Sequence, residues 1–143
     1  MDYLYFFERD MKKLSEEINL YKNENDLLKI KEGISNSAGN ITLHLIGNLN
    51  HFIGKTLANT NYIRERDKEF YLKNVSRKKL TDEINNISTI IKNTLPELSN
   101  EDLKKDFPIK INDKVFSTEN LLVYLLAHLN YHLGQVNYHR RMI

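Results

Sequence analysis

The sequence predicts an all-α fold, most simply a four-helix bundle that forms one domain over residues 1–143. Only two prolines and five glycines interrupt the chain, so long helices meet few breaking residues. Apolar residues recur at steps of three and four in four separate segments, which is the spacing of one helical face. A chain of 143 residues with 41% hydrophobic content is long enough to bury a sizeable core between four such helices.

The first helix is expected from about Asp2 to Tyr21. Its predicted buried face consists of six apolar residues at helical spacing: Leu4, Phe7, Met11, Leu14, Ile18 and Tyr21. The stretch "KNENDLLKIKEGISNS" that follows is polar apart from a short apolar patch. We interpret it as a connection between helices.

The second helix is expected over residues 36–59, with Ser35 or Ser37 as its N-cap. It carries two neighbouring stripes of side chains. One stripe is apolar and contains Ile41, Leu45 and Phe52, and the other contains Asn40, His44, Gly47, His51 and Gly54. Because seven residues make close to two helical turns, His44 and His51 are expected on the same face.

The third helix is expected from near Ser76 to near Leu95, where Pro96 ends it. Its apolar face contains Leu80, Ile84, Ile87, Ile91 and Leu95. Before it, "ANTNYIRERDKEFYLKNV" predicts a charged connection across the surface of the bundle. After it, "ELSNEDLKKDF" is compatible with a short helical turn, and "PIKINDKVFST" predicts a small hairpin near residues 107–117, around Asn112-Asp113.

The fourth helix is expected to begin at Ser117 or Thr118, since either side chain can cap it. Its stripe starts with core leucines and continues with four polar residues: Leu121, Leu125, His128, His132, Gln135 and His139. Polar side chains on a core-facing stripe need partners inside the bundle. We expect the second helix to supply them.

Composition excludes several classes of function. The formal net charge of +2, from 21 basic and 19 acidic residues, and the lack of a basic stripe argue against a nucleic-acid partner. No run approaches 18 apolar residues, so no membrane span is expected. The chain has no cysteine, which excludes thiolate metal ligands and a cysteine nucleophile. Acids and lysines near the start are unlike a signal peptide, and we expect a cytoplasmic location.

The histidines predict a metal site. His128 and His132 lie one turn apart on one helical face, so both can reach a single ion. A third imidazole from the second helix, His44 or His51, would complete a set of three ligands and leave a position for water or substrate, as in catalytic sites. Zinc, nickel, iron and copper all suit imidazole ligands. The alternative interpretation is a hydrogen-bonded cluster of polar side chains without a metal.

Geometry along the helices does not choose between His44 and His51, because helix boundaries are uncertain by a residue or two. If His44 is the third ligand, the spare histidines are His51 and His139. They would line the pocket or act as a general base.

Three segments resemble the DinB/YfiT-like superfamily of four-helix-bundle metalloproteins: "SAGNITLHLIGNLNHFIG", "NYIRERDKEF" and "LLAHLNYHLGQVNYHRR". The first of them resembles a branch that is labelled as a domain of unknown function. The resemblance implies a bundle of up-down-down-up topology, commonly a homodimer, with one divalent metal ion, most often zinc or nickel. It places the metal ligands at His44, His128 and His132.

Some members of this superfamily transfer or isomerise groups with a low-molecular-weight thiol such as bacillithiol, mycothiol or glutathione. The resemblance therefore implies a thiol-dependent transferase, in which the metal holds the thiol as a thiolate. Two alternatives remain: a metal-dependent hydrolase, and a non-enzymatic, stress-related metal-binding dimer.

In the transferase hypothesis, other polar residues would bind the substrate or take part in catalysis. Arg64 and Arg66 could bind a carboxylate of the cofactor, although ion pairs of these arginines with Glu65 and Asp67 are an alternative. The remaining candidates are His51 and Gln135 as catalytic residues, and Asn48, His51, Arg64, Gln135 and His139 as substrate-binding residues.

Overall fold

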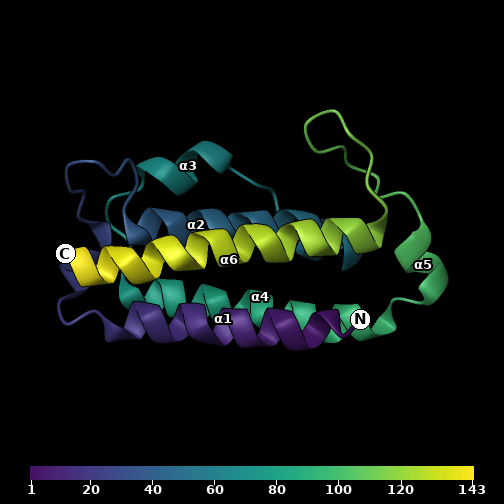
Figure 1. Ribbon diagram of the computed structural model, residues 1–143, viewed down its shortest axis with the longest axis horizontal. Coiled ribbons are helices and arrows are strands. Elements are labelled where there is room, and N and C mark those ends of the chain that lie inside the picture. Colours follow the sequence, from purple (N-terminus) through teal and green to yellow (C-terminus); the bar gives the residue numbers. More distant parts are fainter.

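Four long helices build the protein in a computed structural model that describes residues 1–143. They are α1 (Tyr3–Leu20), α2 (Ala38–Leu49), α4 (Arg77–Thr94) and α6 (Thr118–Met142). In Figure 1, α1 and α6 run in one direction and α2 and α4 in the other. The all-α bundle with up-down-down-up topology is therefore confirmed.

Hydroxyl and carboxyl caps fix where the long helices begin. Ser37 Oγ accepts a hydrogen bond from the backbone N–H of Asn40, so Ser37 rather than Ser35 caps α2. Ser117 caps α6 in the same way, which leaves Thr118 as the first helical residue. Ser76 caps α4 and Asp2 caps α1. Each cap satisfies a backbone donor that has no partner within the helix.

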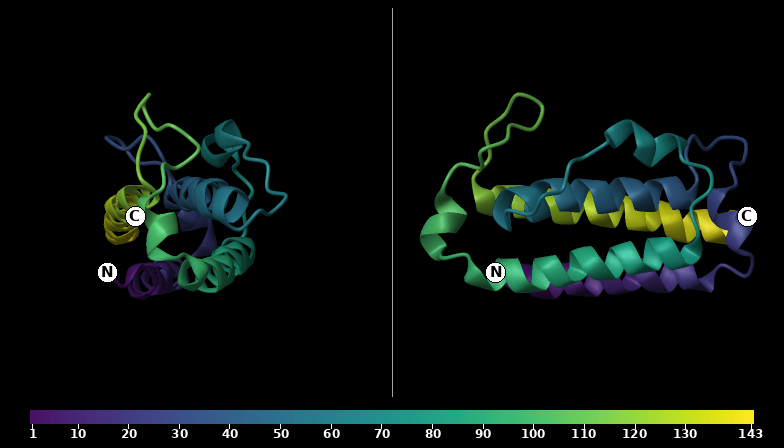
Figure 2. Two further views of the ribbon diagram at one scale, coloured as in Figure 1. Left: turned by 90° about the vertical axis from the view of Figure 1, so that its right-hand side faces the viewer. Right: turned by 180° about the vertical axis from the view of Figure 1, so that it is seen from behind.

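The predicted apolar stripes meet in one core of 27 buried residues. Helix α1 packs against α4 and α6, and α2 packs against the same two helices from the other side. Seen end-on in Figure 2, α1 and α4 form one layer and α2 and α6 the other. Helices α2 and α6 carry four of the five histidines, and His51 lies two residues after the end of α2. None of the helices combines the length and apolar character needed to cross a membrane.

The second helix differs from the expected regular helix over 36–59. After Leu49 the chain continues as a π-helical segment, Asn50–Leu57, in which each turn holds more residues than in an α-helix. The connection that follows contains a short helix, α3 (Arg66–Tyr71). This connection runs back along the outside of α2, as Figure 1 shows, so that α4 starts at the same end of the bundle as α2.

The segment between α4 and α6 is made of short pieces. A 3-10 turn, Leu95–Glu97, includes Pro96, and α5 (Asn100–Lys104) follows; another 3-10 turn, Glu24–Leu28, lies after α1. The predicted hairpin is present only as two antiparallel bridges, Asp106 with Ser117 and Ile111 with Lys114. Positive φ angles of 49° at Asn112 and 62° at Asp113 are those of a type I′ turn.

Candidate metal centre

Three histidines from two helices meet between α2 and α6. One ring nitrogen of each of His44, His128 and His132 lies within 4.8 Å of the others, a grouping that could hold a metal ion. His44 is 6% exposed, and the two α6 histidines are half-buried. The one-turn spacing on α6 puts the His128 and His132 rings 4.6 Å apart, as the sequence pattern predicts.

Hydrogen bonds on the far ring nitrogens direct two of the imidazoles. Nδ1 of His44 donates to Oε1 of Glu69 at 3.0 Å, and Nδ1 of His132 donates to Oε1 of Gln135 at 2.7 Å. With the proton on Nδ1, each ring presents the lone pair of Nε2 to the centre. Carboxylate and amide partners of this kind orient histidine ligands in metal sites.

The spacing of the nitrogens fits a metal. Nε2 of His44 lies 3.1 Å from Nε2 of His128. Two imidazole nitrogens bound to one tetrahedral zinc ion, at about 2.0–2.1 Å each, lie roughly 3.3 Å apart. The buried Nδ1 of His128 has no hydrogen-bond partner. Small adjustments would therefore let the three residues hold a divalent transition metal and leave a position for another ligand.

The electrostatics keep His128 and His132 neutral near pH 7. Burial, followed by the neighbouring His132 and His44, lowers the pKa of His128 to about 4. Burial also lowers the pKa of His132 below its ordinary value, against the opposing effect of the hydrogen bond that His132 donates to Gln135. Neutral imidazole is the form that ligates a metal, so these residues are ready to bind without first losing a proton.

Glu69 of α3 is the buried carboxylate that supports the centre. Burial alone would raise the pKa of Glu69, but hydrogen bonds from His44 and Arg64 lower it below the ordinary value. Arg64 holds both carboxylate oxygens, through Nη2 and Nε, at 2.9 Å each. Arg64 therefore pairs with Glu69, and not with Glu65 or Asp67 as one interpretation of the sequence had it. Its contact with His44 Nδ1, at 3.4 Å, is longer.

The stripe of small and polar residues on α2 is what lets α3 lie so close. Asn40 Nδ2 donates to the backbone carbonyls of Glu69 and Leu72, at 3.0 and 2.8 Å, and so fastens α3 to α2. Gly47 leaves the space for the Glu69 carboxylate, because a Cβ at this position would lie 2.6 Å from the carboxylate carbon. Real Cβ contacts essentially never fall below 3.0 Å. One stripe thus provides His44, a member of the three-histidine group, and the space for the carboxylate of Glu69.

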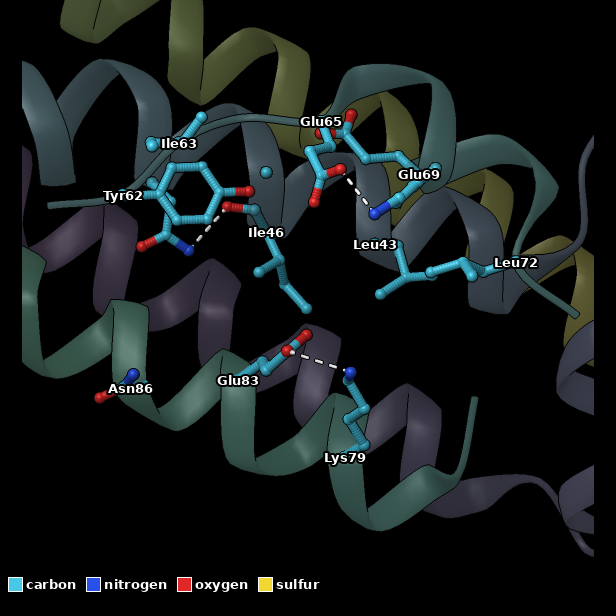
Figure 3. A pocket seen from close by; sticks show the side chains of 13 residues that line it. Leu43, Ile46, Tyr62, Ile63, Glu65, Glu69, Leu72, Lys79, Glu83 and Asn86 are labelled. Carbon is cyan, nitrogen blue, oxygen red and sulfur yellow. Dashed lines mark hydrogen bonds and ion pairs between the residues drawn. The ribbon is translucent and has the colours of Figure 1, made fainter. Parts of the chain in front are cut away.

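Glu69 also lines a pocket of about 550 Å³ between α2, the 62–72 segment and α4. Figure 3 shows Glu65 and Glu69 on the α3 side of this pocket and Lys79 and Glu83 on α4. The lysines there are already paired: Lys68 with Glu65 at 2.5 Å and Lys79 with Glu83 at 3.9 Å. The histidines do not line this pocket.

An aromatic ring stands beside each histidine of the triad. Phe70 lies 5.0 Å from His44, Tyr124 stacks on His128 at 6.4 Å, and Tyr131 lies 5.1 Å from His132, measured between ring centroids. Sequence reasoning missed these rings and Glu69. Phe70 and Glu69 belong to a connection without helical periodicity, and only their place in "NYIRERDKEF" hinted at a role.

Of the other predicted site residues, one contacts the triad and three do not belong to it. Gln135 contacts it directly. Asn48 and His51 do not contribute to the three-histidine group, and Oδ1 of Asn48 and Nδ1 of His51 are buried without a partner. His139 is fully satisfied elsewhere: Tyr21 Oη lies 2.6 Å from its Nδ1, and its Nε2 donates to the Lys29 carbonyl at 2.8 Å.

Comparison with known proteins assigns a family. The family model described as "Protein of unknown function (DUF1572)" matches residues 3–143. The chain belongs to this family. Among solved structures, the DUF1572 chain is similar to the crystal structure of a DinB-like protein from Bacillus cereus ATCC 10987, with a TM-score of 0.75. The identity is 18%, and the match covers 98% of this chain and 89% of that chain.

At this identity the structural likeness shows the fold alone, and it confirms the DinB-like bundle expected for this DUF1572 protein. No curated protein matches the chain. The family description assigns no activity, so the chemistry of the DUF1572 chain has to be inferred from its own residues.

Proposed function

We propose that this protein binds one divalent transition metal ion, zinc or nickel, through His44, His128 and His132, and that it is an S-transferase for a low-molecular-weight thiol. The observation that supports the proposal is the convergence of three ring nitrogens within 4.8 Å, two of them directed by Glu69 and Gln135. Three protein ligands leave a coordination position for a small molecule, as in catalytic zinc sites.

The thiol would come from bacillithiol, mycothiol or glutathione, because the chain has no cysteine of its own. A divalent metal at the triad would supply the positive charge that keeps a bound thiol deprotonated at neutral pH. The proposal places the reaction in the cytoplasm, where such thiols are kept reduced.

The chain's own residues would position the reactants. Glu69 and Gln135 fix the orientation of His44 and His132. The unpartnered Asn48 Oδ1 and His51 Nδ1 are available to hydrogen-bond a substrate. Burial, with Arg64 and Lys55 nearby, lowers the pKa of His51 below its ordinary value, so His51 is neutral near pH 7 and can accept a proton as a general base.

The first experiment is the metal content of protein purified without a histidine tag, for the wild type and for His128→Ala. The proposal predicts about one equivalent of zinc or nickel in the wild type and its loss in the variant. Wild-type protein that stays metal-free after incubation with each ion would refute the proposal.

Thiol binding is then measured with cobalt in place of the native metal, because a thiolate ligand on cobalt gives a strong absorption band. The band should appear with a thiol and not with the matching alcohol. Protein that binds metal and hydrolyses esters or amides without any thiol would instead be a metal-dependent hydrolase. Metal binding with no small-molecule ligand would indicate a non-enzymatic metal-binding protein.

We also propose that the protein is a homodimer. Helix α6 has no Asp, Glu, Lys or Arg from Asn120 to His139, although 28% of the whole chain is charged. Its outward face exposes Val123, Tyr131 and Tyr138, the two tyrosines by 67% and 66%, and uncharged aromatic surfaces are typical of interfaces. The mass in solution by light scattering tests this, and Tyr138→Lys should give a monomer.

A further inference from the structure

The two arginines of "YIRERD" have different partners. Arg64 is bound at two points to Glu69 and is half-buried. Arg66 is exposed and forms no ion pair or side-chain hydrogen bond. Its acidic neighbour in the sequence, Glu65, is bound instead to Lys68 at 2.5 Å. One guanidinium is therefore part of the support of the triad, and the other is free to bind something else.

Arg66 is nevertheless connected to the triad through one aromatic ring. Its guanidinium carbon is 5.6 Å from the centre of the Phe70 ring, and this ring is 5.0 Å from the His44 ring. A cation over an aromatic face is attracted to the ring, which holds the side chain in place. One aromatic ring, Phe70, therefore separates the guanidinium of Arg66 from the His44 ring.

The charge balance around the centre favours an anion. The charges of Arg64 and Glu69 cancel, and histidines that ligate a metal are neutral. A divalent cation and Arg66, which forms no ion pair, would then leave an excess of positive charge. Positive sites walled by apolar rings concentrate anionic ligands.

We propose that Arg66 recognises a carboxylate on the small molecule that binds at the triad, and so selects anionic over neutral ligands. The planar guanidinium can grip the two carboxylate oxygens with two parallel hydrogen bonds. Phe70 orients the guanidinium, and the coordinating end of the ligand sits at the three histidines. This inference rests on the proposed metal site, but it does not depend on which reaction the site performs.

The test uses the full-length protein loaded with cobalt and two matched pairs of probes. The first pair is 3-mercaptopropionate and 2-mercaptoethanol; the second is 4-imidazoleacetate and 4-methylimidazole. In each pair one molecule carries a carboxylate and the other does not, while the coordinating group stays the same. Dissociation constants are read from the cobalt absorption spectrum for the wild type, Arg66→Gln, Arg66→Lys and Arg141→Gln, the last being an exposed arginine without an ion pair, at the end of α6.

We expect the wild type to bind the carboxylate probe of each pair about tenfold more tightly, as one charge-assisted contact at a partly exposed site would give. Arg66→Gln should lose this preference without weakening the neutral probe. Arg66→Lys should keep part of it, and Arg141→Gln should keep all of it. Equal affinities in the wild type, or a preference that survives Arg66→Gln, would overturn the proposal.

The second pair separates this inference from the proposed thiol chemistry. If the imidazole pair binds with the Arg66-dependent preference and neither thiol binds, the thiol transferase fails and the role of Arg66 stands. If both thiols bind equally, the reverse holds. If none of the four probes binds the cobalt protein, the three-histidine centre is closed to these ligands and the inference about Arg66 is wrong.

Discussion

A single methyl group at Gly47 tests how the histidine centre is supported. In Gly47→Ala the new Cβ would lie 2.6 Å from the carboxylate carbon of Glu69 and closer still to Oε2. The carboxylate has to retreat until the contact is at least 3.0 Å. Retreat weakens the 3.0 Å hydrogen bond from His44 and the bonds from Arg64. None of the three proposed metal ligands is altered.

The expected effect on metal affinity is large, and the effect on folding is small. Removing the hydrogen-bond partner of a histidine ligand typically lowers metal affinity by about 10–100-fold. In the metal-free protein, weakened hydrogen bonds to a buried carboxylate cost about 1.5–3 kcal/mol. Alanine in place of glycine inside a helix regains about 1 kcal/mol. The free energy of unfolding should therefore fall by only about 0.5–2 kcal/mol.

The matched control is Gly134→Ala, on α6 between His132 and Gln135. A Cβ at Gly134 meets nothing within 4 Å, so this variant should gain up to about 1 kcal/mol of stability from helix propensity alone. Zinc affinity is measured by competition with a chromophoric chelator, and stability by urea unfolding after chelation. If Gly47→Ala binds zinc as tightly as Gly134→Ala does, the reasoning about Glu69 is refuted.

Three further outcomes follow from other contacts. Tyr21→Phe removes the hydroxyl that lies 2.6 Å from Nδ1 of His139, and should lower the free energy of unfolding by about 1–3 kcal/mol with zinc affinity unchanged; weakened zinc binding would instead tie His139 to the centre. Because the pKa of His128 is lowered to about 4 from 6.5, the unfolded chain binds a proton first. As the pH falls from 6.5 to 4, the free energy of unfolding of the metal-free protein should therefore fall by roughly 2 kcal/mol at most after solvent screening. Urea unfolding at each pH measures this, and an equally steep fall in His128→Gln would contradict it. Asp113 has a φ of 62°, so Asp113→Val should lower the free energy of unfolding by about 1–2 kcal/mol and Asp113→Gly should not. Thermal unfolding measures both, and equal stabilities of the two variants would contradict the left-handed conformation at Asp113.

Sequence reasoning reached the long helices because their signals are local. The stripe on α4 follows its 3.6-residue period without interruption, and Ser76 and Pro96 mark its limits. The same period placed His128 and His132 on one face of α6. It did not foresee that the helix begun at Ser37 would continue as a π-helical segment after Leu49.

The choice of the third histidine shows where local signals stop. His44 and His51 share a helical face, and position along the helix left both open. The structure brings His44 to the α6 pair. The connection that contains α3 folds back over α2, and Glu69 accepts a hydrogen bond from Nδ1 of His44. His51 stays outside the three-histidine group, and its buried Nδ1 lacks a hydrogen-bond partner.

Arg64 and Arg66 are the plainest case of two residues that a sequence cannot tell apart. Both lie in one charged run, and either could have paired with Glu65 or Asp67. Only the path of the connection decides that Arg64 turns inward to Glu69, while Arg66 lies over Phe70.

The sequence by itself determined the helices, their caps and the histidine pair on α6, because each depends on residues within a few positions of one another. The tertiary structure alone decided which distant residues contact them: Glu69 at His44, and Tyr21 at His139. These contacts join positions 25 and 118 residues apart. The contact between Arg66 and Phe70 is local to α3, but only the packing of α3 against Gly47 and Asn40 brings this pair to His44.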